Sequence, residues 1–491
     1  MGAYQPDTAG QGLAFMQVIG GRRAGSFSGE RIEVVCPSDG KVFASIPRGG
    51  QEDVDMAVAA ARDAFDNGPW SRMPAFERGR LLTRLFHLVD AKGDELAALE
   101  SRDTGKPARQ GKADVVATKR YYEFYGGAAD KIHGDTIPFL DGYTALTMRE
   151  PHGVVAGIIP WNYPLQILAR VAGAALAMGN TLVVKPAEDA SLTAIRIAEL
   201  ALEAGFPDGV FNVVTGYGAE AGAALSAHPG VDYVTFTGST LTGTRIQQAA
   251  AVNNRGVTME LGGKSPQIVF ADADLDAALP VLVNAIIQNG GQTCSAGSRI
   301  LIERSVYARV AEALAARFAQ LVAGPHTADL DLGPMINAKQ RDRVEGYIAA
   351  AQEAGIPILA RGTIHQDAPA EGFYAAPALF GSVDPDAALA KEEVFGPVLS
   401  LLAFEDEADA VRLANGTDYG LVAGVWTRDG SRQHRVARRV RAGQVYINGY
   451  GAGGGIELPF GGFKKSGHGR EKGFEALYDM SATKTIVFNH G

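Results

Sequence analysis

One cysteine of the chain, Cys294, lies in a small, polar, glycine-rich stretch over 288–299. The thiolate is the nucleophilic form of cysteine, and neighbouring glycines allow a substrate and backbone N–H donors to approach the sulfur closely. The alternative interpretation is a small buried cysteine at the start of a helix. Asn, Gln, Thr and Ser are poor core residues, so the composition favours a nucleophile, although position alone leaves both interpretations open.

Two other polar residues lie where strands are expected to end. Asn162 follows the apolar run 154–159, and Glu260 stands before two glycines in the run 258–261. An asparagine amide at a strand end can donate to a developing oxyanion, and a carboxylate in a glycine-lined cleft can act as a general base. Each residue also has a plain interpretation, the first as a turn residue between prolines and the second as a surface residue.

Residues suited to a dinucleotide occur at further strand ends. Lys185 and Glu188 could hydrogen-bond ribose hydroxyls, where a carboxylate favours NAD over a 2′-phosphorylated cofactor; a surface ion pair is the alternative. The glycine-containing segments 215–218 and 236–243 each precede a helix, and the second offers hydroxyls and backbone N–H groups to a pyrophosphate. Neither segment matches the usual dinucleotide fingerprint, so each signal is weak when taken alone.

The composition restricts the class of protein. A chain of 491 residues exceeds one core, so two or three domains are expected. The net charge of −9 argues against a nucleic-acid partner and against an anionic membrane surface. Two distant cysteines, Cys36 and Cys294, fit a reducing compartment, and no metal site is predicted. Residues 1–17 lack a signal-peptide pattern and no apolar run reaches the roughly 20 residues that span a bilayer, so we expect a cytoplasmic protein.

The first third of the chain mixes short strands with long helices. Strand-like pieces are expected at 31–35 and 42–46, and helical periodicity at 53–65, 75–103 and 115–129. Residues 137–149 predict a hairpin with an Asp-Gly turn at 141–142. An isolated hairpin cannot stabilise itself, so it should pack on another part of the chain or on a second subunit.

From residue 153 onward strands and helices alternate, which predicts an α/β fold with a parallel sheet covered on both faces. A second α/β series follows, and a late strand is expected at 483–488. The expected strands are 154–159, 181–185, 210–214, 233–237 and 258–261. The expected helices are 165–178, 190–205, 219–227, 243–251, 275–287, 306–322, 339–354 and 407–415.

These motifs together resemble those of the aldehyde dehydrogenase superfamily, in the same order, from about residue 20 to 488. The motifs lie at 160–162, 185–188, 236–239, 260–264, 291–294, 392–397 and 459–467. The resemblance implies two parallel-sheet α/β domains, one cofactor-binding and one catalytic, plus a small β oligomerisation element. It divides the chain into a NAD-binding domain (1–127 and 148–259), a catalytic domain (260–472) and the oligomerisation element (128–147 and 473–491). A homodimer or homotetramer is implied.

The resemblance also implies a reaction and a cofactor. Cys294 would attack an aldehyde, the Asn162 amide and the backbone N–H of Cys294 would hold the oxyanion, and Glu260 would activate water to release the acid. Glu260 favours hydrolysis over transfer to coenzyme A. The cofactor would be NAD, with NADP possible. The implied cofactor residues are Ile159, Pro160, Trp161, Lys185, Glu188, Gly218, Phe236, Gly238, Ser239, Leu261, Gln340, Glu393 and Phe395.

The substrate is a small-molecule aldehyde whose identity the motifs leave open. Arg170 matches a position where semialdehyde-oxidising members bind a distal carboxylate, but their second arginine is replaced here by Gln288. An Arg170 paired with an internal carboxylate is the alternative. The stretch 449–455 is interpreted as lacking the aromatic that many relatives place over the aldehyde, which predicts a roomier entrance. Further candidate substrate residues are Tyr163, Ser295 and Phe460. Alternatives are a broad-range, aromatic or betaine-type enzyme, an esterase-type member, and a non-catalytic member.

Overall fold

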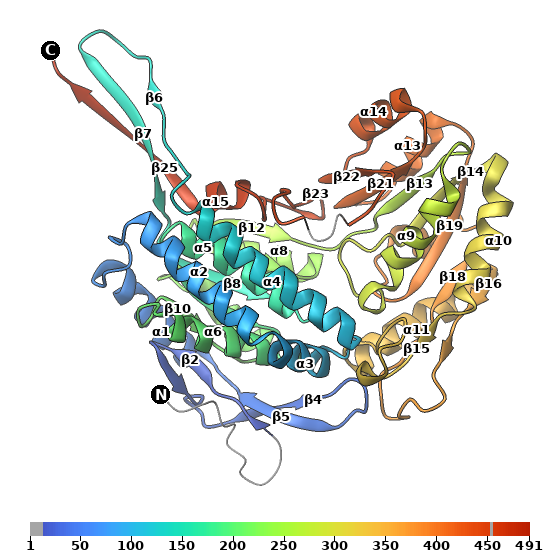
Figure 1. Cartoon of the computed structure of the whole chain (residues 1–491), viewed down its shortest axis with the longest axis horizontal. Coiled ribbons are helices and arrows are strands. Elements are labelled where there is room, and N and C mark those ends of the chain that lie inside the picture. Colours follow the sequence, from blue (N-terminus) through green and yellow to red (C-terminus); the bar gives the residue numbers. More distant parts are fainter. Residues whose placement is uncertain (1–12, 452–454) are drawn as a thin grey trace.

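The computed structural model describes residues 13–451 and 455–491, which form two α/β bodies and a projecting β arm (Figure 1). The first body is built on an eight-stranded sheet of order β24-β12-β11-β8-β9-β10-β2-β3, whose five middle strands are parallel. The edge strands β24, β2 and β3 run antiparallel to their neighbours. The strands span Gly467–His468 (β24), Gly256–Glu260 (β12), Tyr233–Thr237 (β11), Val154–Ile159 (β8), Thr181–Pro186 (β9), Phe211–Val213 (β10), Gln17–Ile19 (β2) and Arg22–Ala24 (β3).

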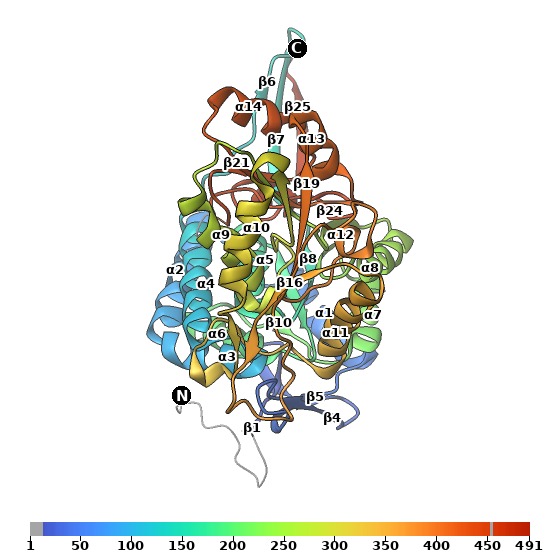
Figure 2. The same cartoon turned by 90° about the vertical axis from the view of Figure 1, so that its right-hand side faces the viewer.

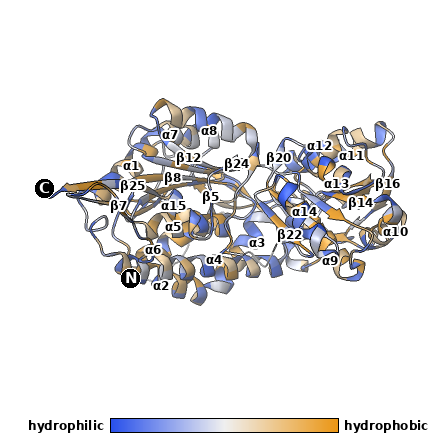
Figure 3. Ribbon diagram, turned by 90° about the horizontal axis from the view of Figure 1, so that it is seen from above, coloured by the Kyte–Doolittle hydropathy of each residue, from blue (hydrophilic) through white to orange (hydrophobic). Residues whose placement is uncertain are grey.

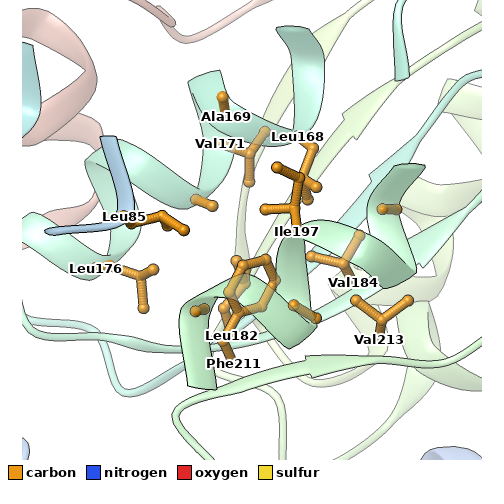
Figure 4. Packing of buried hydrophobic residues seen from close by; sticks show 14 of the residues in the cluster. Leu85, Leu168, Ala169, Val171, Leu176, Leu182, Val184, Ile197, Phe211 and Val213 are labelled. Carbon is orange, nitrogen blue, oxygen red and sulfur yellow. The ribbon is translucent and has the colours of Figure 1, made fainter. Parts of the chain in front are cut away.

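Helices cover both faces of this sheet, as expected for strands such as β8 and β9 whose residues are all buried. Figure 4 shows part of one core, where Leu168 and Val171 lie near Ile197, Leu182 and Val184. The helices on that face are α2 (Ala75–Ala91), α4 (Ala108–Ala128), α5 (Pro164–Ala177) and α6 (Leu192–Ala204). Those on the other face are α1 (Gln51–Asp66), α7 (Ala223–Ala227) and α8 (Thr240–Val252).

The second body holds a seven-stranded sheet of order β16-β18-β19-β14-β13-β21-β22, parallel except for β16. Figure 3 shows its apolar strands lying between helices with polar outer faces, and Figure 2 shows this body nearest the viewer. The strands are β13 (Pro266–Val269), β14 (Arg299–Glu303), β16 (Ile358–Arg361), β18 (Ala378–Phe380), β19 (Val398–Phe404), β21 (Val422–Trp426) and β22 (Gln444–Ile447). The helices are α9 (Leu275–Ile287), α10 (Tyr307–Phe318), α11 (Ala338–Glu353), α12 (Ala388–Lys391), α13 (Glu407–Asn415) and α14 (Gly430–Arg439).

The arm consists of β6 (Thr136–Ile137), β7 (Tyr143–Pro151) and β25 (Ser481–Asn489). Strand β7 pairs with β6 on one edge and with β25 along nine residues on the other, so the predicted hairpin and the predicted tail strand form one sheet. This sheet stands away from the first body (Figure 1). The remaining elements are β1 (Leu13–Ala14), β4 (Arg31–Val35), β5 (Val42–Pro47), β15 (Val322–Ala323), β17 (Thr363–Ile364), β20 (Tyr419–Gly420), β23 (Phe463–Lys464), α3 (Gly93–Thr104) and α15 (Glu475–Asp479).

The predicted α/β class is confirmed, and several predicted bounds differ. The single helix expected over 75–103 is two helices, because the backbone leaves helical geometry at Lys92 before α3 begins at Gly93. The helix expected at 219–227 opens with a π-helical turn, Gly218–Gly222. The helix expected from 243 begins at Thr240, since the Ser239 hydroxyl accepts from the Thr242 N–H and caps it. Among the described residues, no helix is both long and apolar enough to cross a membrane.

Candidate active site

Cys294 lies just after a tight coil between α9 and β14. Three consecutive residues, Asn289, Gly290 and Gly291, have left-handed φ values of 52°, 63° and 74°. A Cβ at Gly291 would collide with the carbonyl of Gly396, and one at Gly263 would collide with the carbonyl of Cys294. The glycines predicted to give access to the sulfur are therefore required by the backbone as well.

Asn162 is brought to this coil from the carboxyl end of β8. Its side-chain amide donates to the carbonyl of Gln292 at 2.9 Å, and its Oδ1 accepts from the Tyr163 N–H at 3.1 Å. An amide nitrogen carries two donors, so the second N–H can serve an oxyanion near Cys294. The structure thus brings Asn162 and the cysteine segment together. This contact favours a role at the thiol over the interpretation of Asn162 as a plain turn residue.

Glu260 is the last residue of β12 and is 2% exposed. Among the described residues, neither of its carboxylate oxygens has a hydrogen-bond partner. Burial first and then the neighbouring Glu471 raise the pKa of Glu260 well above its usual range, while Arg170 opposes this shift. A buried carboxyl with unused oxygens is costly for stability, so its position indicates function rather than packing.

The Cys294 thiol is held in its neutral form by the same surroundings. Burial raises the pKa of Cys294 to about 12; Arg170 counters the shift, and Glu260 adds to it. Since Glu260 and Arg170 both act on the thiol, these three residues from β12, α5 and the cysteine coil share one site. The thiol needs a proton acceptor before it can attack, and Glu260 is the nearby group of the right type.

We expect the alkylation of Cys294 by iodoacetamide to rise about tenfold per pH unit between about pH 6 and pH 9, because the thiolate fraction grows with pH below a raised pKa. Mass spectrometry of the Cys294 peptide, without cofactor, measures this rate. A plateau near neutral pH would contradict the raised pKa. The buried Cys36, measured in the same samples, reports any unfolding at high pH.

Arg170 is buried and already has an anionic partner. Its guanidinium forms an ion pair with Glu471, and its Nη2 lies 3.4 Å from the Thr237 hydroxyl oxygen. The second Glu471 oxygen accepts from Thr235 Oγ1 at 3.1 Å. Arg170 Cζ is 5.3 Å from the ring centroid of Phe460, which packs near Cys294. The internal pairing that the sequence left open is thus present.

Aromatic side chains line the region of the thiol. Phe460 clusters with Leu421 and Val422, and Cys294, Tyr446 and Tyr450 pack against this cluster. The Tyr450 hydroxyl donates to the carbonyl of Ser295. The prediction that the 449–455 stretch lacks an aromatic near the aldehyde is therefore wrong, because Tyr450 packs against the same cluster as Cys294 and bonds to the residue that follows it. Gly451, which follows Tyr450, has a left-handed φ of 72°. Residues 452–454 of that stretch lie outside the described residues.

The other candidate substrate residues differ in position. Tyr163 is buried, and its hydroxyl lies 2.9 Å from the Thr293 hydroxyl, beside the cysteine. Ser295 follows the cysteine directly and is half-buried. Gln288 is exposed at the start of the coil, where its carbonyl accepts from Thr293 Oγ1 at 3.4 Å. The structure therefore groups Tyr163, Ser295 and Phe460 around the thiol and leaves the side chain of Gln288 at the surface.

Most residues expected to hold the cofactor lie at or after the ends of β8, β9, β10 and β11. Lys185 and Glu188 form an ion pair of 3.0 Å at the end of β9. Gly238 precedes Ser239 at the exposed start of α8, where free backbone N–H groups suit a phosphate. The others in this region are buried Ile159 and Phe236, half-buried Pro160 and Trp161, and exposed Gly218.

The residues expected near the nicotinamide come from both bodies. Glu393 Oε1 accepts from the Gly263 N–H at 2.9 Å, and burial raises the pKa of Glu393 to about 7. Gln340 Nε2 donates to the carbonyl of Phe395 at 2.8 Å, and the Phe395 ring meets Trp161 edge-on at 5.4 Å. Leu261 is buried beside Glu260. A Cβ at Gly262 would collide with the Glu393 carboxylate, so the backbone at Gly262 can lie close to this carboxylate only because residue 262 is a glycine.

Sequence reasoning missed three charged residues at the site. Glu471 pairs with Arg170, and Lys472 lies with its Nζ 5.0 Å from the Phe460 ring centroid. Lys106 donates to the carbonyl of Asn162 at 3.1 Å. Lys106 stands between a glycine and a proline, which looks like a helix end, and no local pattern marks Glu471 or Lys472. Only the packing of distant segments shows what these residues contact.

Comparisons with known proteins identify the family to which the chain belongs. A family model described as "Aldehyde dehydrogenase family" matches residues 25–486. The chain is 44% identical over 473 residues to aldehyde dehydrogenase family 2 member B4, mitochondrial, of Arabidopsis thaliana, covering 96% of this chain and 87% of the relative. A crystal structure of a putative aldehyde dehydrogenase from Burkholderia cenocepacia is 63% identical with a TM-score of 0.96, covering 97% and 100% of the two chains. A betaine aldehyde dehydrogenase from Staphylococcus aureus in complex with NAD+ is 36% identical with a TM-score of 0.94, covering 97% and 95%.

Proposed function

The chain belongs to the aldehyde dehydrogenase family, and on that premise we propose that it oxidises an aldehyde to the carboxylic acid with NAD+ and water. The observation that carries the proposal is the meeting of a thiol, an amide donor and an unpaired buried carboxylate from three separate segments, namely Cys294, Asn162 and Glu260. These are the nucleophile, the oxyanion donor and the base that acyl chemistry on a thiol requires.

The residues present fit NAD. Ser239 at the start of α8 would hold the pyrophosphate, and Lys185 with Glu188 the adenosine ribose. Glu393 would hold the nicotinamide ribose. Its carboxylate accepts from the Gly263 N–H and lies close to the backbone of Gly262. When bound, NAD+ supplies the hydride acceptor. A carboxylate at Glu188 disfavours a 2′-phosphate, which supports a preference for NAD over NADP.

In the first step the Cys294 sulfur attacks the aldehyde carbon. The raised pKa of the thiol requires that its proton leave, and Glu260 is the base that reaches the thiol's environment. The second amide N–H of Asn162, with the backbone N–H of Cys294, would hold the oxyanion of the thiohemiacetal. Removing one such donor typically costs about 10²–10³ in rate.

In the second step Glu260 takes a proton from the water that hydrolyses the thioester. Before this step Glu260 releases to solvent the proton that it took from the thiol, and its oxygens, which have no hydrogen-bond partner among the described residues, are then available to the water. Glu471 favours the neutral form of Glu260 and Arg170 the charged form, so the Arg170–Glu471 pair sets how readily the base ionises. The free acid leaves and the thiol is restored.

For the substrate we propose a neutral aldehyde with an aromatic or alkyl chain. The side chains around the thiol are largely aromatic, namely Tyr163, Tyr446, Tyr450 and Phe460, and the charge of Arg170 is already balanced by Glu471. A carboxylated semialdehyde is the second candidate, because the Arg170 guanidinium lies over Phe460 beside the thiol and could exchange partners.

The test is NADH formation at 340 nm with benzaldehyde, medium-chain aldehydes, betaine aldehyde and succinate semialdehyde. We expect kcat/KM for neutral aldehydes to equal or exceed that for the semialdehyde, and Arg170→Gln to lower both classes by a similar factor. A semialdehyde preference of about a hundredfold, about 2.7 kcal/mol, that Arg170→Gln removes would establish the second candidate instead. Absence of NADH with every aldehyde would contradict the proposed reaction.

We further propose that the β arm joins copies of this chain into a homodimer or homotetramer. Its sheet stands off the body and exposes apolar side chains on both of its long strands and on the hairpin turn: Ile137, Phe139, Leu140, Tyr143, Met148, Val487 and Phe488. Exposed apolar surface of this kind marks an interface. The division into NAD-binding, catalytic and oligomerisation parts, and a cytoplasmic location, also remain proposals.

A further inference from the structure

A fully buried lysine, Lys106, contacts the backbone of Asn162. The side chain of Lys106 is 0% exposed, and its Nζ donates to Glu100 Oε1 at 3.0 Å, to Asp114 Oδ2, and to the carbonyl oxygen of Asn162 at 3.1 Å. An ammonium has three donors, so all three are used. Although burial alone would lower it, the two carboxylates raise the pKa of Lys106, which keeps the ammonium charged.

The two carboxylates are held from their other sides. Asp114 Oδ1 accepts from Gln166 Nε2 at 2.6 Å, and Glu100 Oε2 accepts from Thr193 Oγ1 at 3.0 Å. These contacts tie the ammonium to α3, α4, α5 and α6, all of which contribute residues to the core on one face of the first sheet. The Lys106 ammonium is therefore fixed by residues of four helices. Its third N–H donates to the backbone carbonyl of Asn162, just after the end of β8.

The carbonyl of Asn162 is held by a second donor from the cysteine coil. Asn289 Nδ2 donates to this carbonyl at 2.9 Å, while the Asn162 amide donates to Gln292 at 2.9 Å. The Asn289 backbone N–H donates to Gln110 Oε1 at 3.1 Å, so the first turn of α4 also reaches the coil. Both lone pairs of the Asn162 carbonyl are thus used, and its peptide plane cannot rotate without breaking one of these bonds.

We propose that Lys106 is a positioning residue that holds Asn162 in the orientation needed to bind the oxyanion formed at Cys294. The inference rests on the proposed function, since it assigns the amide of Asn162 to that oxyanion. Lys106 touches the backbone of Asn162 and acts on the reaction only through that residue.

Lys106 acts by fixing the position of Asn162, not by the attraction of its charge for the oxyanion. The one ammonium donates to two carboxyl groups, so the cluster has no excess of positive charge. Such a cluster offers no attraction to a developing oxyanion. An amide displaced by about 1 Å, in contrast, can cost about a hundredfold in rate.

The test compares two replacements with a matched control. Lys106→Met combined with Glu100→Gln and Asp114→Asn removes the donor without leaving unpaired buried charges. Lys106→Arg keeps the charge, but its planar fork cannot reproduce three divergent bonds from one atom. Lys112→Met, at an exposed position on the nearby helix α4, is the control. Thermal melting of each shows which variants are folded, and Lys106→Arg serves if the triple variant is not.

The readout is the single-turnover rate of NADH formation with an aldehyde that the wild-type protein oxidises. We expect a loss of about a hundredfold in the triple variant and about tenfold in Lys106→Arg. NAD binding and the iodoacetamide alkylation of Cys294 should stay within about threefold of wild type. On an Asn162→Ala background the same changes should cost less than about threefold, because Lys106 has no other route to the reaction.

Each contrary result has a distinct meaning. Effects that multiply on the Asn162→Ala background, or an equal loss of NAD binding and thiol alkylation, would show a merely structural lysine and overturn the inference. Full single-turnover rates in both variants would overturn it as well. A wild-type protein that forms no NADH with any aldehyde would refute the proposed function itself, before any variant is compared.

Discussion

Replacing Cys294 with alanine is expected to abolish aldehyde oxidation, with a loss of at least about 10⁴-fold in kcat. Without the sulfur no thiohemiacetal forms, and the oxyanion donors have no intermediate to bind. Cofactor binding should stay near normal, since Cys294 packs against the cluster that contains Phe460, whereas the proposed ribose ligands lie at the end of β9 and in the 393–395 segment. NADH formation at 340 nm and NAD titration by fluorescence quenching measure the two properties separately.

The matched control is Cys36→Ala. Cys36 is 2% exposed, and burial raises its pKa, yet it lies outside the group of residues that contact Cys294. That variant should keep full turnover with a small loss of thermal stability. If Cys294→Ala lost NAD binding together with turnover, the thiol would be a structural residue. If Cys294→Ala kept measurable steady turnover, the nucleophile would be another residue.

The fold was predictable where local pattern and burial agree. The strand 233–237 and the helix 275–287 have their predicted bounds, because β11 is buried throughout and the Asp274 carboxylate caps α9 by accepting from the Ala277 N–H. The break at Lys92 was not predictable, since the apolar periodicity of 75–103 continues across it. Edge strands such as β24, with two residues, carry too little pattern to be recognised before their partner is known.

The site divides in the same way. Asn162 follows β8 and Glu260 ends β12, two parallel strands of one sheet, and residues at such ends converge, so their meeting could be predicted from their places in the sequence. Arg170 could not be interpreted, because the carboxylate that pairs with it, Glu471, lies near the other end of the chain. Lys106 was hidden for the same reason. Long-range pairing of buried charges leaves no local periodicity for a sequence to display.

Replacing Glu260 with glutamine is expected to separate the two halves of the reaction. The variant should still release about one NADH per active site in a first turnover, more slowly than wild type because water must then accept the thiol proton, and its later steady turnover should be about 10³-fold slower than that of wild type. Glutamine fills the same buried space at the end of β12 but cannot accept a proton from water. Stopped-flow absorbance at 340 nm shows the burst, and the later slope gives the steady rate.

The pH dependence of the steady rate identifies the base. Burial and Glu471 raise the pKa of Glu260, so this carboxyl ionises at higher pH than an ordinary glutamate and wild-type kcat should rise with pH as it ionises. The glutamine variant should lack this rise. Glu475→Gln, an exposed glutamate after the Glu471 segment, is the control and should keep both the rate and the pH profile.

Two outcomes would change the assignment of Glu260. An unchanged steady rate in Glu260→Gln would remove this residue from hydrolysis, and the water would need another base. Loss of the burst would show that Glu260 is also the main acceptor of the thiol proton, which the coupling between Glu260 and Cys294 makes chemically reasonable. Since Arg170 opposes the raised pKa of both groups, Arg170→Gln should move both pH profiles to higher pH, and this shared shift would link the thiol and the base through one buried guanidinium.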